Sequence, residues 1–387
     1  MAKTLLVLTG GGLSPACNSL LFGVINEAQK NNWKILGGLF GWRSLLEEGQ
    51  NIDLSDFDAT LIRNKGGTFL RSSRINPFKI ANGVEQIKQN FKKQGVDALV
   101  VIGGDDTLGA AHLLSKNEDI QIIGLPKTID NDLSETYWTP GYPSAAWYFA
   151  DFVKKIKMHA AYALSRIFIV EVPGFKSGWL AASGAYGLAN VILTPEKPIN
   201  CRWALETIAE TYLKNGGYAV VVVSQYAKFD EPIIGLADEQ DDQYNNDRRF
   251  FIGLSFTDFL KKELKLDVRS LHPGNFLEAV DPIEIDKKLS EEMGAKAVQL
   301  IVEGRNSLAV SLKRPDYAKN DIEVSFCTLE KMAGCGQFHF LSEKMFDFEN
   351  FTVTDKFFDY LEPVFGPRPK LNEPYLELQK RIVSEGL

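Results

Sequence analysis

At 387 residues and a formal net charge of −7, the chain is longer than one hydrophobic core usually serves, so we expect two lobes. No segment forms the basic face that a nucleic acid needs, and no apolar run approaches the roughly 20 residues of a membrane helix. Four scattered cysteines, and an amino terminus that passes directly into a strand pattern without room for a signal, predict a reduced cytoplasmic protein.

Strand and helix patterns alternate along the chain. Apolar runs predict strands over residues 5–8, 34–39, 99–102, 121–125, 167–172, 218–224 and 307–313. Amphipathic spacing predicts helices over 20–28, 84–94, 145–164, 202–215, 251–265 and 283–303. Residues 238–247 have the composition of a solvated loop, and the Phe- and Pro-rich stretch from about Asp321 shows no pattern that we can assign. The alternation without an internal repeat predicts an α/β protein of two doubly wound lobes.

The first predicted strand ends in the glycine turn Thr9-Gly10-Gly11-Gly12, and a helix follows it. This order offers backbone N–H groups and a helix N-terminus to a phosphate, although the glycines also suit a plain tight turn. The spacing is not G-x-G-x-x-G, which argues against a dinucleotide-binding dehydrogenase. A polar loop over residues 65–74 carries two arginines and is, taken alone, either a solvated turn or a phosphate clamp.

Two further strands end in polar clusters. The run 99–102 leads into Gly103-Gly104-Asp105-Asp106-Thr107, and the run 121–125 leads into Pro126-Lys127-Thr128-Ile129-Asp130-Asn131-Asp132. Because neighbouring parallel strands end at the same edge of a sheet, we expect the two clusters to converge. Glycines, four aspartates, a lysine and two threonines are a set suited to phosphate and metal.

Three segments together resemble the phosphofructokinase family, and smaller matches extend the resemblance to about residue 315. They are Thr9-Gly10-Gly11-Gly12-x-x-Pro15-x-x-Asn18, Gly66-Gly67-Thr68-x-x-x-Ser72-Ser73-Arg74 and the pair of clusters between Gly103 and Asp132. The resemblance implies a two-lobed fold with the site in the cleft, and glycolytic transfer of a terminal phosphoryl group to a sugar phosphate. It also implies a donor lobe of residues 1–143 with about 266–305, and an acceptor lobe of residues 144–265 with about 306–387.

The resemblance also implies residue roles. Asp130 matches the general base, with Lys127 and Asp132 beside it as catalytic residues, and Asp105 matches the carboxylate that holds Mg²⁺. The residues expected to bind the donor phosphate are Gly11, Gly12, Arg74, Asp106 and Thr107. The residues expected to bind the acceptor are Thr128, Arg166, Arg269 and Gly174.

The choice of donor depends on two positions. Family members that use ATP usually carry glycine where this chain has Asp106 and Lys127. A carboxylate at position 106 would repel the α-phosphate of a nucleotide, and Lys127 would add a cation for a donor that lacks adenosine contacts. The pair therefore resembles the pyrophosphate-dependent branch, whose smaller driving force implies a reversible reaction. A plain helix N-cap remains an alternative for Asp106, but it does not explain Lys127.

The acceptor side departs from the family. The usual Met-Gly-Arg is Pro173-Gly174-Phe175, the usual Glu is Gln225, and the usual Gln-Arg-Gly segment is replaced by residues 273–278. In contrast, Arg166 and Arg269 match two arginines that reach the sugar 6-phosphate from a neighbouring subunit, which implies a homodimer or homotetramer. Lys176 and His272 are either replacement contacts or ordinary surface residues.

Three interpretations follow. The first is a Mg²⁺-dependent transfer from pyrophosphate to fructose 6-phosphate. The second is the same chemistry on another sugar phosphate, such as sedoheptulose 7-phosphate. The third is a non-catalytic family member that binds phosphates and regulates a partner, and the retained Asp105, Lys127, Asp130 and Arg74 argue against it.

Overall fold

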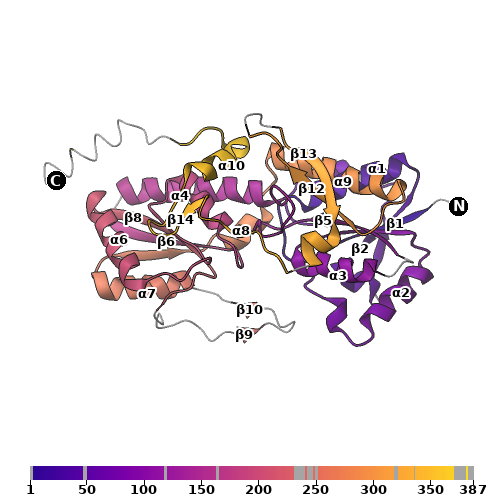
Figure 1. The fold of residues 1–387 in the computed structure, drawn as a ribbon, viewed down its shortest axis with the longest axis horizontal. Coiled ribbons are helices and arrows are strands. Elements are labelled where there is room, and N and C mark those ends of the chain that lie inside the picture. The colour runs from indigo at the N-terminus through magenta and orange to yellow at the C-terminus, as the bar shows by residue number, and fades with distance from the viewer. Residues whose placement is uncertain are drawn as a thin grey trace. The chain divides into compact units, whose positions relative to one another are not determined.

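The computed structural model describes residues 3–46, 50–116, 120–162, 165–230, 240–241, 247–248, 252–317, 321–334, 336–369 and 381. The chain divides into two compact units, one of Met1–Ala145 with Phe276–His339 and one of Ala146–Asn275 with Phe340–Leu387. Figure 1 labels many of the elements named below. Each unit is built on a parallel or mainly parallel sheet covered by helices, which confirms the predicted α/β class with two doubly wound lobes.

The first unit contains a seven-stranded sheet. Its strand order is β13 (Glu323–Thr328), β12 (Leu308–Lys313), β5 (Gln121–Pro126), β4 (Ala98–Gly103), β1 (Thr4–Thr9), β2 (Lys34–Gly38) and β3 (Asn51–Asp53). The five inner strands run parallel, whereas both edge strands are antiparallel to their neighbours. The carboxyl ends of β1, β4 and β5 therefore meet at one edge of this sheet.

Helices cover both faces of this sheet. On one face, α2 (Gly83–Lys93) and α3 (Asp105–Ser115) share a buried cluster with alternate side chains of β1, β4 and β5. The side chains of β1, β4 and β5 that point to the other face are also buried. Two helices contact these strands: α1 (Cys17–Lys30) contacts β1, and α9 (Glu284–Val302) contacts β4 and β5. A Cβ on Gly23 would lie 2.1 Å from the Glu291 carbonyl oxygen, and one on Gly294 would lie 2.3 Å from the Leu20 carbonyl oxygen. Glycine at both positions therefore lets α1 and α9 pack closely.

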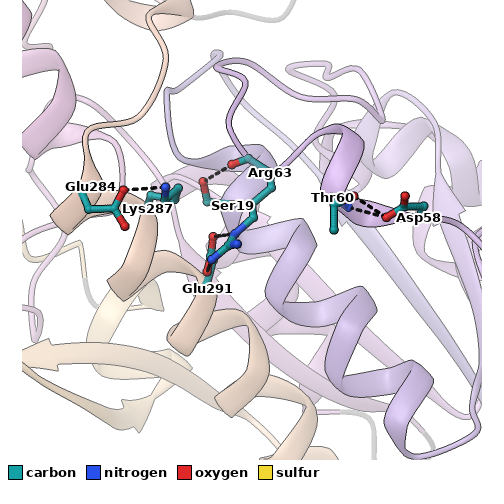
Figure 2. Close-up of polar contacts among 7 residues, drawn as sticks. All are labelled: Ser19, Asp58, Thr60, Arg63, Glu284, Lys287 and Glu291. Carbon is teal, nitrogen blue, oxygen red and sulfur yellow. Dashed lines mark hydrogen bonds and ion pairs between the residues drawn. The ribbon is translucent and has the colours of Figure 1, made fainter.

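Polar contacts attach the segment 58–66 to these two helices, as Figure 2 shows. The Arg63 guanidinium makes a bidentate pair with the Glu291 carboxylate, with N–O distances of 2.5 and 2.7 Å, and Ser19 donates to the Arg63 carbonyl. Asp58 accepts a hydrogen bond from the Thr60 amide at 3.0 Å. These bonds fix the start of the polar loop 65–74 that the sequence associated with phosphate.

The second unit contains a four-stranded parallel sheet. Its strand order is β11 (Val268–Leu271), β6 (Arg166–Val172), β8 (Tyr218–Ser224) and β7 (Val191–Leu193). On one face, α6 (Cys201–Lys214) and α7 (Ile252–Leu264) share a buried cluster with alternate strand side chains. Aromatic contacts join α5 (Trp179–Ser183) to α10 (Asp355–Phe365). Phe149 of α4 (Tyr142–Tyr162) and Val222 of β8 both lie close to Gly184.

Short elements complete the described chain. They are α8 (Gly274–Ala279), β9 (Gln240–Asp241), β10 (Asp247–Arg248), β14 (Phe346–Asp347), β15 (Thr352–Val353), the 3-10 turns η1 (Gly41–Leu45), η2 (Ala59–Leu61), η3 (Pro77–Lys79) and η4 (Gly184–Gly187), and the π turn η5 (Glu330–Gly334). Of the expected loop 238–247, only β9 and the first residue of β10 lie within the described residues. None of the helices in the described ranges is long and apolar enough to cross a membrane.

The boundaries of the two units differ from those expected from the sequence. Residues 266–275 were expected in the first lobe, but β11 pairs with β6 in the sheet of the second unit. Residues 306–339 were expected in the second lobe, but β12 pairs with β5 and β13 pairs with β12 in the sheet of the first unit. Strand pairing, which the local sequence does not encode, decides both assignments.

Candidate active site

The turns after β1 and β4 are in close contact at the carboxyl edge of the first unit's sheet. A Cβ on Gly10 would lie 2.7 Å from Thr107 Oγ1, and one on Gly103 would lie 2.4 Å from the Thr107 Cβ. Any larger residue at either position would displace the buried Thr107 side chain in the first turn of α3. The glycines therefore bring both turns and the start of α3 into one small volume.

Lys127, the first residue after β5, lies at the glycine turn. Its side chain is 2% exposed and its Nζ donates a hydrogen bond to the Gly12 carbonyl. Nζ also lies 3.5 Å from the place of a Cβ on Gly11, whose φ of +84° favours glycine. The structure thus brings Gly11, Gly12 and Lys127 together at this edge of the sheet.

The polar loop 65–74 is bonded to the same turn. The Gly11 amide donates to the Ser73 carbonyl at 3.0 Å, and Ser72 Oγ donates to the Gly11 carbonyl at 2.6 Å. These bonds place Arg74 next to the turn, where its charge acts on Asp130. They also occupy the N–H of Gly11, a residue that the resemblance assigned to the donor phosphate.

Asp130 is held by the chain around it. Its amide donates to Thr128 Oγ1 at 3.1 Å, and the buried Asn131, with a φ of 57°, accepts from the Thr139 amide at 2.9 Å through Oδ1. Loss of solvation raises the pKa of Asp130 to about 6, while the Thr128 hydroxyl, Lys127 and Arg74 oppose that rise. Asp132 is 5% exposed and its carbonyl accepts from the His339 amide at 2.7 Å. Asp130 is therefore a fixed carboxylate whose pKa suits a base near neutral pH.

Asp105 and Asp106 open helix α3. The N-cap residue is Gly104, and no side chain caps this helix, so Asp106 is not the N-cap that one interpretation of the sequence proposed. Within the described residues no group of three or more His, Cys, Asp or Glu side chains could hold a metal ion. Mg²⁺ commonly uses one or two carboxylates together with phosphate oxygens and water, so Asp105 fits a magnesium ion that arrives with the donor.

Sequence reasoning did not assign Glu278 to the site. This residue of α8 places Oε1 3.9 Å from the position of a Cβ on Gly12. Burial and the Asp130 carboxylate raise the pKa of Glu278, while Lys127 and Arg74 lower it. One feature of the sequence could have pointed to Glu278: it is the only carboxylate in the segment 273–278, which replaces the family's Gln-Arg-Gly.

Two of the predicted acceptor residues lie side by side in the second unit. Arg166 begins β6, and Arg269 is the second residue of the neighbouring β11. Both pair with one carboxylate: Arg166 Nη2 lies 3.2 Å from Asp267 Oδ2, and Arg269 Nε lies 2.8 Å from Asp267 Oδ1. The two guanidinium groups and Asp267 form an arginine pair with one net positive charge at the amino end of β6.

Gly174 lies at the other end of β6. A strand of seven residues spans roughly 20 Å, so within one chain Gly174 and the arginine pair do not meet. A Cβ on Gly174 would lie 2.5 Å from the Ser177 carbonyl oxygen, which requires glycine in this turn. Thr128 belongs to the first unit, beside Asp130.

A cavity of about 540 Å³ opens at the carboxyl ends of β6, β7 and β8 in the second unit. Lys176, Lys197 and Lys228 line it, together with Tyr226 and Phe340. Lys197 is paired with Glu343 at 2.5 Å. His272 lies outside this lining: its Nε2 is 2.8 Å from Ser270 Oγ, and its Nδ1 is 3.5 Å from Glu171 Oε2.

The Phosphofructokinase family profile matches residues 4–301, which is more than half of the chain. The chain therefore belongs to the phosphofructokinase family. It is a phosphotransferase.

Similar proteins include both donor types. A pyrophosphate–fructose 6-phosphate 1-phosphotransferase from Amycolatopsis methanolica is 33% identical over 317 residues, covering 81% of this chain and 91% of that protein. An ATP-dependent 6-phosphofructokinase from Corynebacterium efficiens is 31% identical over 335 residues, covering 86% and 96%. The crystal structure of a pyrophosphate-dependent phosphofructokinase from Marinobacter aquaeolei aligns with a TM-score of 0.82 at 24% identity, covering 96% of this chain and 94% of that one. This last likeness supports the fold.

Proposed function

We propose that this protein transfers a phosphoryl group from pyrophosphate to the 1-hydroxyl of fructose 6-phosphate, giving fructose 1,6-bisphosphate and phosphate, and that the reaction is reversible. The observation that carries the proposal is the group formed by Lys127, the Gly11–Gly12 turn and Asp130 at one sheet edge. This group combines a cation for the donor with a base for the acceptor, which are the two parts that phosphoryl transfer needs.

The donor is inferred from Lys127 and Asp106, because the relatives use either donor. The buried Lys127 ammonium lies against the glycine turn, where it stabilises the charge of a compact anion. Asp106 is exposed in the first turn of α3 and does not cap that helix. Its carboxylate would repel the extra phosphate of a nucleotide, so both residues favour pyrophosphate.

In the proposed reaction, the Asp130 carboxylate accepts the proton of the acceptor hydroxyl while the hydroxyl oxygen bonds to the terminal phosphorus of pyrophosphate. The bridging P–O bond breaks and inorganic phosphate leaves. Thr128 orients Asp130 through the hydrogen bond between its Oγ1 and the Asp130 amide. Arg74 adds a second positive charge on the donor side. Mg²⁺ held at Asp105 would neutralise charge on the donor oxygens.

The arginine pair supports a homo-oligomer. Because Arg166 and Arg269 lie at the opposite end of β6 from Gly174, one acceptor molecule does not reach both within this unit. We therefore assign the arginine pair to the acceptor phosphate bound by a neighbouring subunit of a homodimer or homotetramer. Guanidinium groups suit this role because they bind phosphate oxygens bidentately.

The test crosses two donors with several acceptors. Purified protein with Mg²⁺ is assayed with pyrophosphate or ATP and with fructose 6-phosphate, sedoheptulose 7-phosphate or other sugar phosphates. We expect turnover with pyrophosphate and fructose 6-phosphate, and the reverse reaction from fructose 1,6-bisphosphate and inorganic phosphate.

Other results would overturn parts of the proposal. Efficient use of ATP would contradict the roles of Asp106 and Lys127. A strong preference for sedoheptulose 7-phosphate would keep the chemistry and change the acceptor. Absence of turnover with every combination would favour a regulatory protein.

A further inference from the structure

Glu278 faces the candidate active site from an element outside the predicted clusters. Helix α8 presents its carboxylate to the glycine turn, with Oε1 3.9 Å from the position of a Cβ on Gly12. The Gly12 carbonyl accepts the hydrogen bond of the Lys127 ammonium. The Glu278 carboxylate and the Lys127 ammonium therefore approach the same short turn, although they come from distant parts of the sequence.

Two cations and two carboxylates gather here. The charges of Lys127 and Arg74 act on both Asp130 and Glu278, and the Asp130 charge acts on Glu278. The Lys127 charge lowers the pKa of the buried Cys17 thiol, and the Glu278 charge raises it. Both charges therefore lie near the start of α1. Glu278 is partly buried, and a hydrogen bond from the Leu13 backbone favours its ionised form.

We propose that Glu278 is a positioning residue that competes with Asp130 for Lys127 and Arg74, and so keeps the Asp130 carboxylate available for the acceptor proton. The inference rests on the proposed role of Asp130 as general base. With two cations and a single carboxylate, Lys127 and Arg74 would both be drawn toward Asp130, and a paired carboxylate is a weaker base. A second carboxylate divides the attraction of the two cations.

The second carboxylate also acts directly on Asp130. Two negative charges in one partly buried site oppose each other, which favours the protonated form of each. Glu278 thereby helps hold the proton affinity of Asp130 in the range of a base that works near neutral pH. The charged groups that act on Glu278 are Asp130 and Lys127, from the segment after β5, and Arg74, from the loop before α2. On α1, Cys17 is the titratable group on which the Glu278 charge acts.

The experiment is a pH profile of the Glu278→Gln enzyme, measured with pyrophosphate, saturating Mg²⁺ and the best acceptor. Glutamine keeps the size of the side chain and removes its charge. We expect the acidic limb of kcat/KM to move to lower pH by on the order of one unit, the scale of a neighbouring charge. We expect kcat above that limb to fall severalfold, because Asp130 becomes a weaker base, while KM for the acceptor stays within about twofold.

Glu278→Asp and Glu284→Gln are the matched variants. Glu278→Asp keeps the charge, so we expect its acidic limb to move from the wild-type position by less than about half the shift seen in Glu278→Gln. Glu284→Gln loses the same charge at an exposed position on α9, where Glu284 pairs with Lys287 at 2.6 Å (Figure 2), and it keeps the wild-type profile. Thermal unfolding of each variant shows that the protein is folded when it is assayed.

An unchanged acidic limb in folded Glu278→Gln would overturn the inference. An equal shift in Glu278→Asp would overturn it as well, because it would show that side-chain shape and not charge is responsible. Asp130→Asn separates this failure from failure of the proposed function. If Asp130→Asn abolishes turnover while Glu278→Gln leaves the pH profile unchanged, the assignment of Asp130 as general base is supported and the proposed role of Glu278 is wrong.

Discussion

The carboxyl edges of the two sheets are built in different ways. In the first unit, the turns after β1, β4 and β5 pack directly on one another, and buried or bonded side chains such as Lys127 and Asp130 leave little freedom. In the second unit, the corresponding edge is an open cavity bordered by exposed lysines, and the arginine pair lies at the opposite edge. The first edge is a set of packed turns, whereas the second edge is bordered by long, exposed side chains.

Under the proposed function, this difference separates the groups that perform the chemistry from those that recognise the substrate. Groups that move a proton or stabilise a phosphoryl group must be held within fractions of an ångström, which favours a packed edge such as that of the first unit. Groups that recognise a substrate phosphate tolerate longer and more exposed side chains. Substitutions in the two regions should therefore change different kinetic constants.

The largest expected effect comes from Asp130→Asn. Without a carboxylate at this position the acceptor hydroxyl keeps its proton, so kcat should fall roughly 10²- to 10⁴-fold with little change in either KM. The measurement is steady-state kinetics with pyrophosphate and the best acceptor. Asp58→Asn, at an exposed carboxylate that bonds to Thr60 (Figure 2), is the control and should retain full activity. Turnover within tenfold of wild type would remove Asp130 from the role of base.

The next effect comes from the arginine pair. Arg166→Ala and Arg269→Ala should each raise KM for the sugar phosphate about 10- to 100-fold, since a hydrogen bond to a charged group contributes about 1.5–3 kcal/mol. The change in kcat should be small. Arg202→Ala provides the control, because this exposed arginine of α6 pairs only with Glu206 one helical turn away among the described contacts. A KM equal to wild type in both variants would contradict the assignment of these arginines to the acceptor.

The pH dependence tests the packed edge without a mutation. Burial raises the pKa of Asp130 to about 6, and a general base works only when it is ionised. Activity should therefore be constant above about pH 7 and fall about tenfold for each pH unit below about 6. The measurement is kcat/KM at fixed Mg²⁺, corrected for the ionisation of pyrophosphate. Constant activity down to pH 4.5 would show that Asp130 is not the group that limits the reaction.

The smallest effect is expected at the open cavity. Lys176→Ala and Lys228→Ala remove exposed cations from its rim, and KM for the acceptor should rise less than about threefold. The measurement is KM for the acceptor, determined in the same way as for the arginine variants. An increase larger than that of Arg269→Ala would move the acceptor phosphate from the arginine pair to the cavity.

The packed edge was the more predictable region because its information is local. The strand predicted over 218–224 and the run 99–102 are confirmed as β8 and as part of β4, since long apolar runs bounded by turns leave few alternatives. The polar clusters follow two parallel strands, so their convergence followed from strand direction alone. The positions of Lys127 and Asp130 at this edge could therefore be predicted from the amino-acid sequence.

Features that depend on distant pairing could not be read in this way. Strand β11 is only four residues long, and β13 contains only half-buried and exposed residues, so neither shows which sheet it joins. Glu278 approaches Gly12 through the path of the chain around α8, for which residues 273–278 carry no periodic signal. The bond from the Gly11 amide to Ser73 likewise joins two loops whose contact is decided by tertiary packing.

The discontinuity of the first unit has a consequence for its synthesis. Strand β5 ends at Pro126, but its parallel neighbour β12 begins at Leu308. Helix α9, which contacts this sheet, also comes after the segment Ala146–Asn275 of the second unit. At about 5–20 residues per second, a ribosome leaves β5 as an unpaired edge for roughly ten to thirty seconds. The second unit, completed mostly by residues that emerge earlier, has time to fold in that interval. Translation speed and chaperones that bind exposed strand edges should therefore govern the yield of this protein more than its final stability does.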